Sequence, residues 1–182
     1  MKTISEHILD IVQNSIRAKA TLIEIIVEED KKNDLYTLII RDNGCGMDKT
    51  TLEQATGAFF TSRNTRKVGL GLALLKQNAE QCNGHLVLKS EVGKGTEVNA
   101  FFQLSNIDRP PLGDVWNSFY LCLLSEKQTE IKYRHKTENG VFEISSEEVK
   151  QALPGMPFSN KEIRNGIIEL IKNNLTDIKA TF

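Results

Sequence analysis

The sequence predicts a protein of the α/β class, and three observations point to that class. Apolar residues recur with helical spacing over residues 5–20, and residues 21–29 and 35–42 are runs of β-branched and apolar side chains. A second helical pattern begins at paired glycines and is followed by two further strand patterns. The chain has 182 residues, of which 40% are hydrophobic and 26% charged, which is enough for one good core and a small second one.

The N-terminal elements follow from local signals. Ser5 is placed to cap the first helix, and the polar loop "DKKND" joins the first two strands. Asp48 is placed to cap a short helix over residues 48–56. Residues 57–68 show neither period, so we expect a mobile loop there.

The next elements form a second helix and a hairpin. The helix begins at Gly71 and is expected to stop at Gly84, because glycine is the usual residue just beyond a helix end. Strands are predicted over residues 85–90 and 96–104, joined by the turn "EVGKG".

A domain boundary is predicted in "SNIDRPPLGD", because adjacent prolines continue neither a helix nor a strand. This divides the chain into residues 1–104 and a small α+β region, residues 105–182, of unknown role. That region is expected to contain a helix over residues 114–124, a hairpin with "ENG" at its tip and a final helix. Ser159 and Glu162 have the spacing of a capping box at the start of that helix.

Charge and hydropathy limit the partners. Lys and Arg (23) nearly cancel Asp and Glu (24), so no large field of one sign would draw the molecule onto nucleic acid or an anionic membrane. The apolar stretches are shorter than a membrane span, and the N-terminus has no signal-peptide core. We therefore expect a cytoplasmic protein.

The first helix carries a polar face that has two interpretations. Asp10, Asn14 and Arg17 fall within an arc of roughly 60°, opposite the apolar stripe. A solvated surface would explain them. An acid, an amide and a cation are also what a site for metal-bound phosphates needs, with Asn14 as a Mg²⁺ ligand, Arg17 on phosphate and Asp10 orienting a nucleophile.

Three glycine-rich segments are equally ambiguous when taken singly. In "RDNGCGMD" the Asp42 carboxylate could accept from the exocyclic amine of adenine, with Gly44 and Gly46 letting the backbone approach a flat ring, or the segment could be a plain turn. Gly69 and Gly71 could admit phosphate to the positive end of the following helix. "GKGTEV" adds a glycine pair and the Thr96 hydroxyl.

The order and spacing of four segments resemble the ATP-binding domain shared by gyrase, Hsp90, histidine kinases and MutL. "DIVQNSIRA" is similar to the N box of that family, "DNGCGM" and "VGLGLALL" to its first two glycine boxes, and "GKGTEV" to its last. The resemblance covers about residues 1–104. It implies a two-layer α/β sandwich of the Bergerat type, with a mixed sheet and helices on one face, that binds ATP and Mg²⁺.

The resemblance also implies residue roles. Asn14 corresponds to the Mg²⁺ ligand, Arg17 to a phosphate contact and Asp42 to the adenine acceptor. Further nucleotide contacts are expected at Gly44, Gly46, Met47, Gly69, Leu70, Gly71 and Thr96. The segment "AFFTSRNTRK" is similar to the ATP lid, which makes Arg63, Arg66 and Lys67 candidates for the phosphates.

Departures from related patterns leave two classes of function open. A P-loop is disfavoured because "GxxxxGK[ST]" is absent, and a dinucleotide fold because "GLGLAL" lacks the third glycine. Asp10 is the catalytic candidate, although relatives that hydrolyse ATP or phosphorylate serine have a glutamate there. Because few residues precede the N box, we expect no upstream phosphoacceptor-histidine module.

One class is an enzyme, either a stand-alone kinase that phosphorylates a partner protein or a slow ATPase. The other is an ATP-dependent switch that binds a partner, as in anti-sigma-factor-like relatives. The partner would be a regulatory protein that contacts the C-terminal region or the ATP lid.

Overall fold

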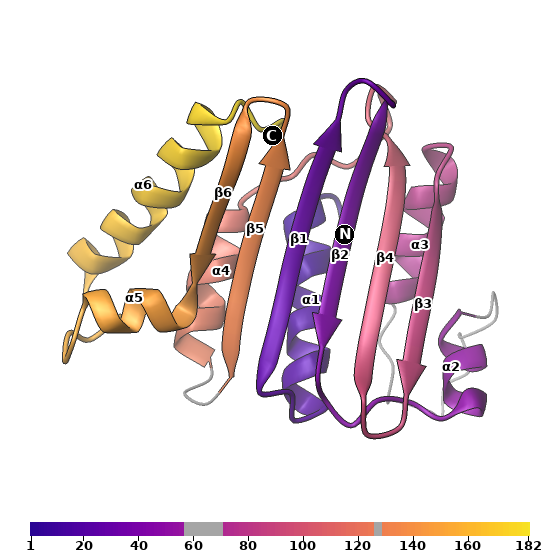
Figure 1. Ribbon diagram of the computed structural model, residues 1–182, viewed down its shortest axis with the longest axis horizontal. Helices are drawn as coiled ribbons and strands as arrows, with labels where there is room; N and C mark the ends of the chain where they lie inside the picture. The colour runs from indigo at the N-terminus through magenta and orange to yellow at the C-terminus, as the bar shows by residue number, and fades with distance from the viewer. Residues whose placement is uncertain (57–70, 126–128) are drawn as a thin grey trace.

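A single six-stranded mixed sheet organises the fold, and its main helices pack against one of its faces (Figure 1). The computed structural model describes residues 1–56, 71–125 and 129–182. The predicted two-layer α/β architecture is confirmed. The strands are β1 (Leu22–Asp30), β2 (Leu35–Asp42), β3 (His85–Glu91), β4 (Gly95–Gln103), β5 (Glu130–Thr137) and β6 (Gly140–Ser145).

The strand order is β3-β4-β2-β1-β5-β6. Neighbouring strands run antiparallel except β1 and β5, which pair in parallel. In the β2–β4 pairing Asp42 lies opposite Thr96, so the end of β2 meets the start of β4. This register brings two of the segments with predicted roles to one end of the sheet.

The helices of the described chain are α1 (Ile4–Arg17), α2 (Lys49–Thr56), α3 (Gly71–Gln81), α4 (Val115–Ser125), α5 (Ser146–Ala152) and α6 (Lys161–Asp177). α1, α3 and α4 lie on the rear face in Figure 1, where α1 packs against both of the others. The predicted apolar stripe of α1 is buried, with Ile4, Ile8 and Val12 at most 1% exposed. These side chains fill the space between the helices and the sheet.

Two predicted helix ends are displaced by one or two residues. Thr3, not Ser5, caps α1, and its hydroxyl accepts from the Glu6 N–H at 3.3 Å. Ser5 lies inside the helix, where its N–H donates to Leu112. The residue that ends α3 in the left-handed conformation is Asn83 (φ 56°), one residue before the predicted Gly84. Gly84 is needed for another reason: a Cβ there would lie 1.8 Å from the Phe101 carbonyl oxygen.

The C-terminal elements extend the same sheet. β5 and β6 form the predicted hairpin, and β5 pairs with β1, while α4 packs against α1. The sheet and the core therefore continue past residue 104. The division into residues 1–104 and 105–182 stays a prediction that the two parts have different roles.

Two helix starts in this region differ from the sequence prediction. The helix α5 was not predicted; it begins at a capping box formed by Ser145 and Glu148. The final helix is capped by Asn160 rather than Ser159, because the Asn160 amide oxygen accepts from the Glu162 N–H at 2.7 Å.

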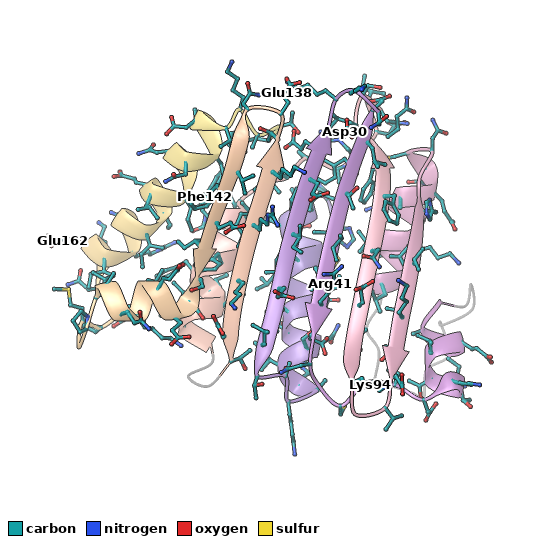
Figure 2. The ribbon with its side chains drawn as sticks, viewed as in Figure 1. Asp30, Arg41, Lys94, Glu138, Phe142 and Glu162 are labelled. Atoms are coloured by element: carbon teal, nitrogen blue, oxygen red, sulfur yellow. The ribbon has the colours of Figure 1, made fainter. Side chains whose placement is uncertain are left out.

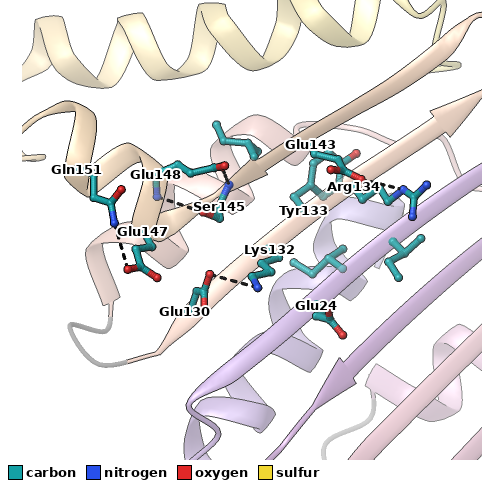
Figure 3. A pocket seen from close by; sticks show the side chains of 13 residues that line it. Glu24, Glu130, Lys132, Tyr133, Arg134, Glu143, Ser145, Glu147, Glu148 and Gln151 are labelled. Carbon is teal, nitrogen blue, oxygen red and sulfur yellow. Dashed lines mark hydrogen bonds and ion pairs between the residues drawn. The ribbon is translucent and has the colours of Figure 1, made fainter.

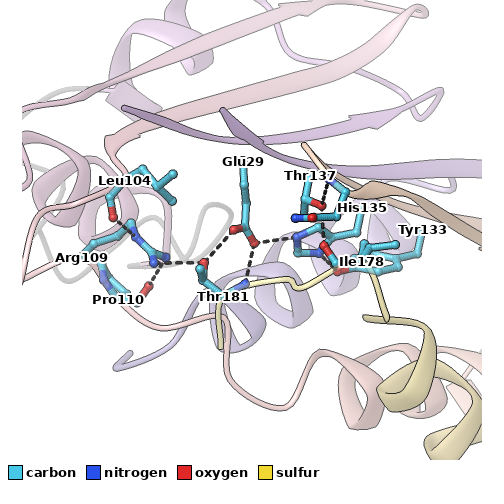
Figure 4. A network of polar contacts seen from close by, with 10 residues as sticks. Glu29, Leu104, Arg109, Pro110, Tyr133, His135, Thr137, Ile178 and Thr181 are labelled. Atoms are coloured by element: carbon cyan, nitrogen blue, oxygen red, sulfur yellow. Dashed lines mark hydrogen bonds and ion pairs between the residues drawn. The ribbon is translucent and has the colours of Figure 1, made fainter. Parts of the chain in front are cut away.

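A buried polar network fastens the C-terminal residues to the sheet (Figure 4). The Glu29 carboxylate accepts from the N–H and the hydroxyl of Thr181, both at 2.9 Å, and contacts His135 Nε2 at 2.8 Å. Burial alone would raise the pKa of Glu29, but these hydrogen bonds outweigh it and lower that pKa. Arg109 donates to the Thr181 hydroxyl and stacks over the Tyr36 ring. The proline-containing segment 105–114, which connects β4 to α4, therefore joins the same network.

The other face of the sheet is charged and is not covered by α1, α3 or α4 (Figures 1 and 2). On three neighbouring strands, Lys89 and Arg41 both pair with Glu97, at 3.3 and 2.6 Å. The Arg41 side chain points toward the viewer in Figure 2. Alternation between this polar face and the buried one follows from the two-residue period of a strand.

Candidate functional site

The segments with predicted roles meet at one end of the sheet, at the bottom of Figure 1. α1 and β2 end there and β4 begins there, whereas α3 begins farther along the helical layer, beside Asp10 in the middle of α1. Contacts join α1, β2, the glycine turn and β4 to one another, and α3 contacts this group through Asp10 of α1. These contacts can be followed outward from Asp42.

Asp42, the last residue of β2, is half-buried and held in two directions. One carboxylate oxygen accepts from the Ser15 hydroxyl at 2.7 Å, and the other accepts from the Gly44 N–H at 2.9 Å. A carboxylate has about four lone-pair sites, so each oxygen can still accept from another donor. The result is an oriented acceptor at the mouth of the glycine turn. Ser15, which is 2% exposed, was not predicted as a site residue.

The glycine turn after Asp42 lies against the chain on both sides. The Cys45 N–H donates to Ala18 at the end of α1, and the Cys45 carbonyl accepts from Gly93 in the β3–β4 turn. A Cβ on Gly44 would lie 2.8 Å from the Ala18 carbonyl oxygen. Gly46 has φ +66°, and a Cβ there would lie 2.0 Å from the Glu91 carbonyl oxygen. The close approach that requires these two glycines is to the chain's own backbone.

Ser90 connects the glycine turn to the start of β4. Its hydroxyl accepts from the Met47 N–H at 2.8 Å, and it contacts the Thr96 hydroxyl at 3.0 Å. Ser90 was missed because no motif marks it. The signal available was its position opposite Thr96 across the predicted hairpin, which the register confirms. Met47 and Thr96 are thereby brought to the same edge as Asp42.

The three polar residues of α1 form a line along the helix. The Asn14 amide approaches Asp10 Oδ2 at 3.5 Å, and Arg17 donates to Asn14 Oδ1 at 3.2 Å. Asp10 and Asn14 are half-buried, whereas Arg17 is exposed. A Cβ on Gly71 would lie 1.9 Å from Asp10 Oδ2, so the first residue of α3 packs directly on this carboxylate. The structure therefore brings Asp10, Asn14 and Gly71 together.

The oxygen atoms of Asp10 and Asn14 could bind a hard cation such as Mg²⁺ if phosphate groups supplied most of its other ligands. The described residues contain no group of three His, Cys, Asp or Glu side chains that could hold a metal by themselves. Mg²⁺ usually takes only one or two protein ligands beside phosphate oxygens and water. The Asn14 amide oxygen and the Asp10 carboxylate are donors of the required type, and a cation at Asn14 Oδ1 would compete with Arg17.

The remaining predicted contacts lie outside the described residues. These are Arg63, Arg66, Lys67, Gly69 and Leu70.

A separate cavity of about 490 Å³ lies on the other side of the molecule, between the charged sheet face and α5 (Figure 3). Its charged side chains pair with one another, as Arg134 does with Glu143 at 3.1 Å and Lys132 with Glu130 at 3.5 Å. None of the predicted site residues lines it. The glycine turn, and not this cavity, is therefore the candidate site that matches the sequence prediction.

Comparison with known proteins identifies the family of the segment that contains the four motifs. A family model described as histidine kinase-, DNA gyrase B-, and HSP90-like ATPase matches residues 2–106. A putative sensor protein of Shewanella frigidimarina is 37% identical over 103 residues, which are 56% of this chain and 16% of that protein. The autoinducer 1 sensor kinase/phosphatase LuxN of Vibrio campbellii is 25% identical over 170 residues, which are 92% of this chain and 19% of LuxN. The chain thus spans less than a fifth of the length of either relative.

A solved structure shares the fold. The N-terminal domain of a DNA repair protein superposes with a TM-score of 0.55 at 15% identity, covering 85% of this chain and 58% of that one. Among the described residues, none of the helices combines the length and apolar character that crossing a membrane requires. The match over residues 2–106 covers more than half of the sequence and contains all four motifs, so the chain belongs to the histidine kinase-, DNA gyrase B- and HSP90-like ATPase family.

Proposed function

We propose that this protein binds Mg²⁺-ATP at the glycine turn and acts as a regulatory kinase that phosphorylates a partner protein, or as a slow ATPase. The observation that carries the proposal is the arrangement around Asp42. Its carboxylate is fixed by Ser15 and Gly44 at the end of β2, and Ser15 directly follows Asn14 of the α1 polar line. Membership of an ATPase family supports ATP as the ligand.

Asp42 would select adenine over guanine. A carboxylate can accept from the exocyclic amine of adenine, whereas guanine presents a carbonyl oxygen at the equivalent position, and two acceptors repel. Ser15 and Gly44 restrict rotation of the carboxylate, which lowers the entropy that binding must remove.

The phosphates would lie between α1 and α3. The free N–H groups and the dipole at the start of α3 favour negative charge there. Asn14 would hold the Mg²⁺ ion, which when bound neutralises charge on the phosphate oxygens. Arg17 is exposed at the end of the same line and would contact phosphate as a cation.

Asp10 would orient the attacking group, either water or a protein hydroxyl. It is the α1 carboxylate that lies next to Asn14, with its Oδ2 3.5 Å from the Asn14 amide. A general base must come within hydrogen-bond reach of the proton that it removes. The aspartate is one methylene shorter than the glutamate of hydrolysing relatives, so we propose slow intrinsic turnover.

A second candidate function is a non-catalytic ATP-dependent switch that binds a regulatory partner through the C-terminal region or the ATP lid. The observation that favours it is the position of Asp10. Its carboxylate is packed on Gly71 and lies 3.5 Å from the Asn14 amide, which limits its reach toward a nucleophile.

The test combines a binding assay with γ-³²P-labelled ATP. Label on protein supports a kinase, released phosphate supports an ATPase, and tight binding with neither supports the switch. The Asp42→Asn variant should lose most ATP affinity while its thermal melting stays close to that of the unaltered protein. Equal affinity for ATP and GTP in the unaltered protein would remove Asp42 as an adenine acceptor.

A further inference from the structure

A buried histidine on α1 joins this helix to α3 on the side away from solvent. His7 is 0% exposed, and its Nε2 lies 3.0 Å from the Asn78 side-chain nitrogen. The amide nitrogen can only donate, so Nε2 accepts and the ring proton is on Nδ1. No role was predicted for this position from the sequence.

The same ring lies beside the first residue of α3. Nδ1 is buried and has no hydrogen-bond partner among the residues that the structure describes. The backbone of Gly71 acts on the ring in the direction that favours its protonated form, although burial, the larger effect, lowers the pKa of His7 to about 4. His7 is therefore neutral near pH 7, and its contacts extend from Gly71 to Asn78 along α3.

α1 therefore contacts α3 at two places, one near the start of α3 and one two turns later. Asp10, one turn after His7, packs on Gly71 so closely that a Cβ would lie 1.9 Å from its carboxylate oxygen. Asn78, two turns after Gly71, bonds to His7. A rigid α3 cannot move at Asn78 without moving at Gly71, because interiors are close-packed and transmit small displacements.

We propose that His7 is a positioning residue that, through Asn78, sets where α3 begins relative to Asp10 and Asn14. This inference rests on the proposed function, in which the start of α3 and the α1 polar line receive the phosphates. Asp42 is the last residue of β2, and Ser15 lies on the side of α1 that faces it. The Asn78 side chain bonds to His7 and not to either of them. Because Gly71 packs on Asp10, which in the proposed function orients the group that attacks the γ-phosphate, His7 acts on recognition of the γ-phosphate and not on recognition of adenine.

The experiment compares two nucleotides that differ only at the γ-phosphate. Isothermal titration with ADP and with a non-hydrolysable ATP analogue, both at saturating Mg²⁺, is carried out on the full chain. Asn78→Ala removes the donor at a half-buried position, where the fold should tolerate it. We expect analogue affinity to fall about tenfold while ADP affinity stays within about twofold, since small misplacements near reacting groups have large effects.

Two further variants separate positioning from simple packing. In His7→Gln the amide oxygen can replace Nε2 as the acceptor for Asn78, and the preference for the analogue should be retained. His7→Leu keeps the bulk, loses the acceptor and should behave as Asn78→Ala does. Gln77→Ala, exposed on the same helix, is the matched control and should change neither affinity.

The outcomes distinguish this inference from the function on which it rests. Equal losses for ADP and the analogue, or no change in Asn78→Ala, would show that the His7–Asn78 contact is only structural and would overturn the inference. If the unaltered protein binds neither nucleotide, the proposed function fails, and this inference fails with it. If His7→Gln loses the preference for the analogue over ADP, the hydrogen bond that Nε2 accepts from Asn78 is not what maintains that preference, and the inference is overturned.

Discussion

Asp10 and Gly71 face each other across the α1–α3 contact so closely that a Cβ on Gly71 would lie 1.9 Å from Asp10 Oδ2. A side chain of the N box therefore occupies the space that a Cβ on Gly71, in the second glycine box, would need. Two motifs that are 61 residues apart in the sequence meet at this one contact.

The first prediction concerns Gly71→Ala. The new methyl group should push the Asp10 carboxylate aside, because the end of a side chain yields more easily than backbone. Phosphate release or transfer should fall, while stability changes by no more than about 1 kcal/mol, since alanine favours a helix more than glycine does. Melting curves and turnover are measured together. Ala73→Gly, exposed on α3, is the control, and equal turnover in Gly71→Ala and the unaltered chain would contradict the prediction.

The second prediction concerns Asp10 itself. Asp10→Glu restores the length found in hydrolysing relatives and should raise phosphate release, whereas Asp10→Asn should abolish what release there is. Both variants should still bind ATP, because adenine recognition is assigned to Asp42. Identical release rates from the three proteins at saturating Mg²⁺-ATP would remove Asp10 from the catalytic list.

The third prediction concerns the metal. Asn14→Ala should weaken ATP binding in Mg²⁺ more than ATP binding in EDTA, since the lost oxygen is the proposed ligand of the ion and has no proposed contact with the base. The ratio of the two dissociation constants is the quantity to measure. Gln13→Ala, exposed on the adjacent position of α1, should leave the ratio unchanged. An unchanged Mg²⁺ dependence in Asn14→Ala would count against Asn14 as a ligand.

The fourth prediction compares two glycines with positive φ. Gly46 (φ +66°) has the Glu91 carbonyl oxygen 2.0 Å from a built Cβ, whereas Gly93 (φ +78°) has no atom within 4 Å. Gly93→Ala should therefore cost only the backbone strain, about 1 kcal/mol. Gly46→Ala must also displace backbone and should cost about 3 kcal/mol. Denaturant unfolding measures both, and equal costs would show that the close approach is not maintained in solution.

The fifth prediction concerns acid pH. The pKa of His7 is about 4 in the folded protein, below the value of about 6.5 in an unfolded chain, so between these values the unfolded state binds more protons. Stability should fall as pH decreases from about 6.5 to about 4, by as much as about 3 kcal/mol from this group. Glu29, whose pKa is lowered, adds a loss at still lower pH. His7→Gln should flatten the upper part of this profile, whereas His85→Gln, at an exposed site, should not.

The sequence predicted the order and type of most elements because their signals are local. The range of β2 was predicted residue for residue, and the start of α3 at its glycine. Capping was harder, because Thr3 and Ser5, or Ser159 and Asn160, offer similar side chains and tertiary packing chooses between them. Ser15, Ser90 and Asn78 were missed since their contacts join segments distant in the sequence.

Parallel pairing of β1 with β5 has a consequence for any shortened form of the protein. Residues 22–28 of β1 share their ladder with residues 130–136, so a fragment ending at residue 106 would leave β1 as an edge strand. That strand is rich in isoleucine and valine, and an uncovered edge of this kind templates pairing with other chains. Residues 1–106 alone should therefore self-associate, whereas in the full chain the β5–β6 hairpin covers this edge of β1.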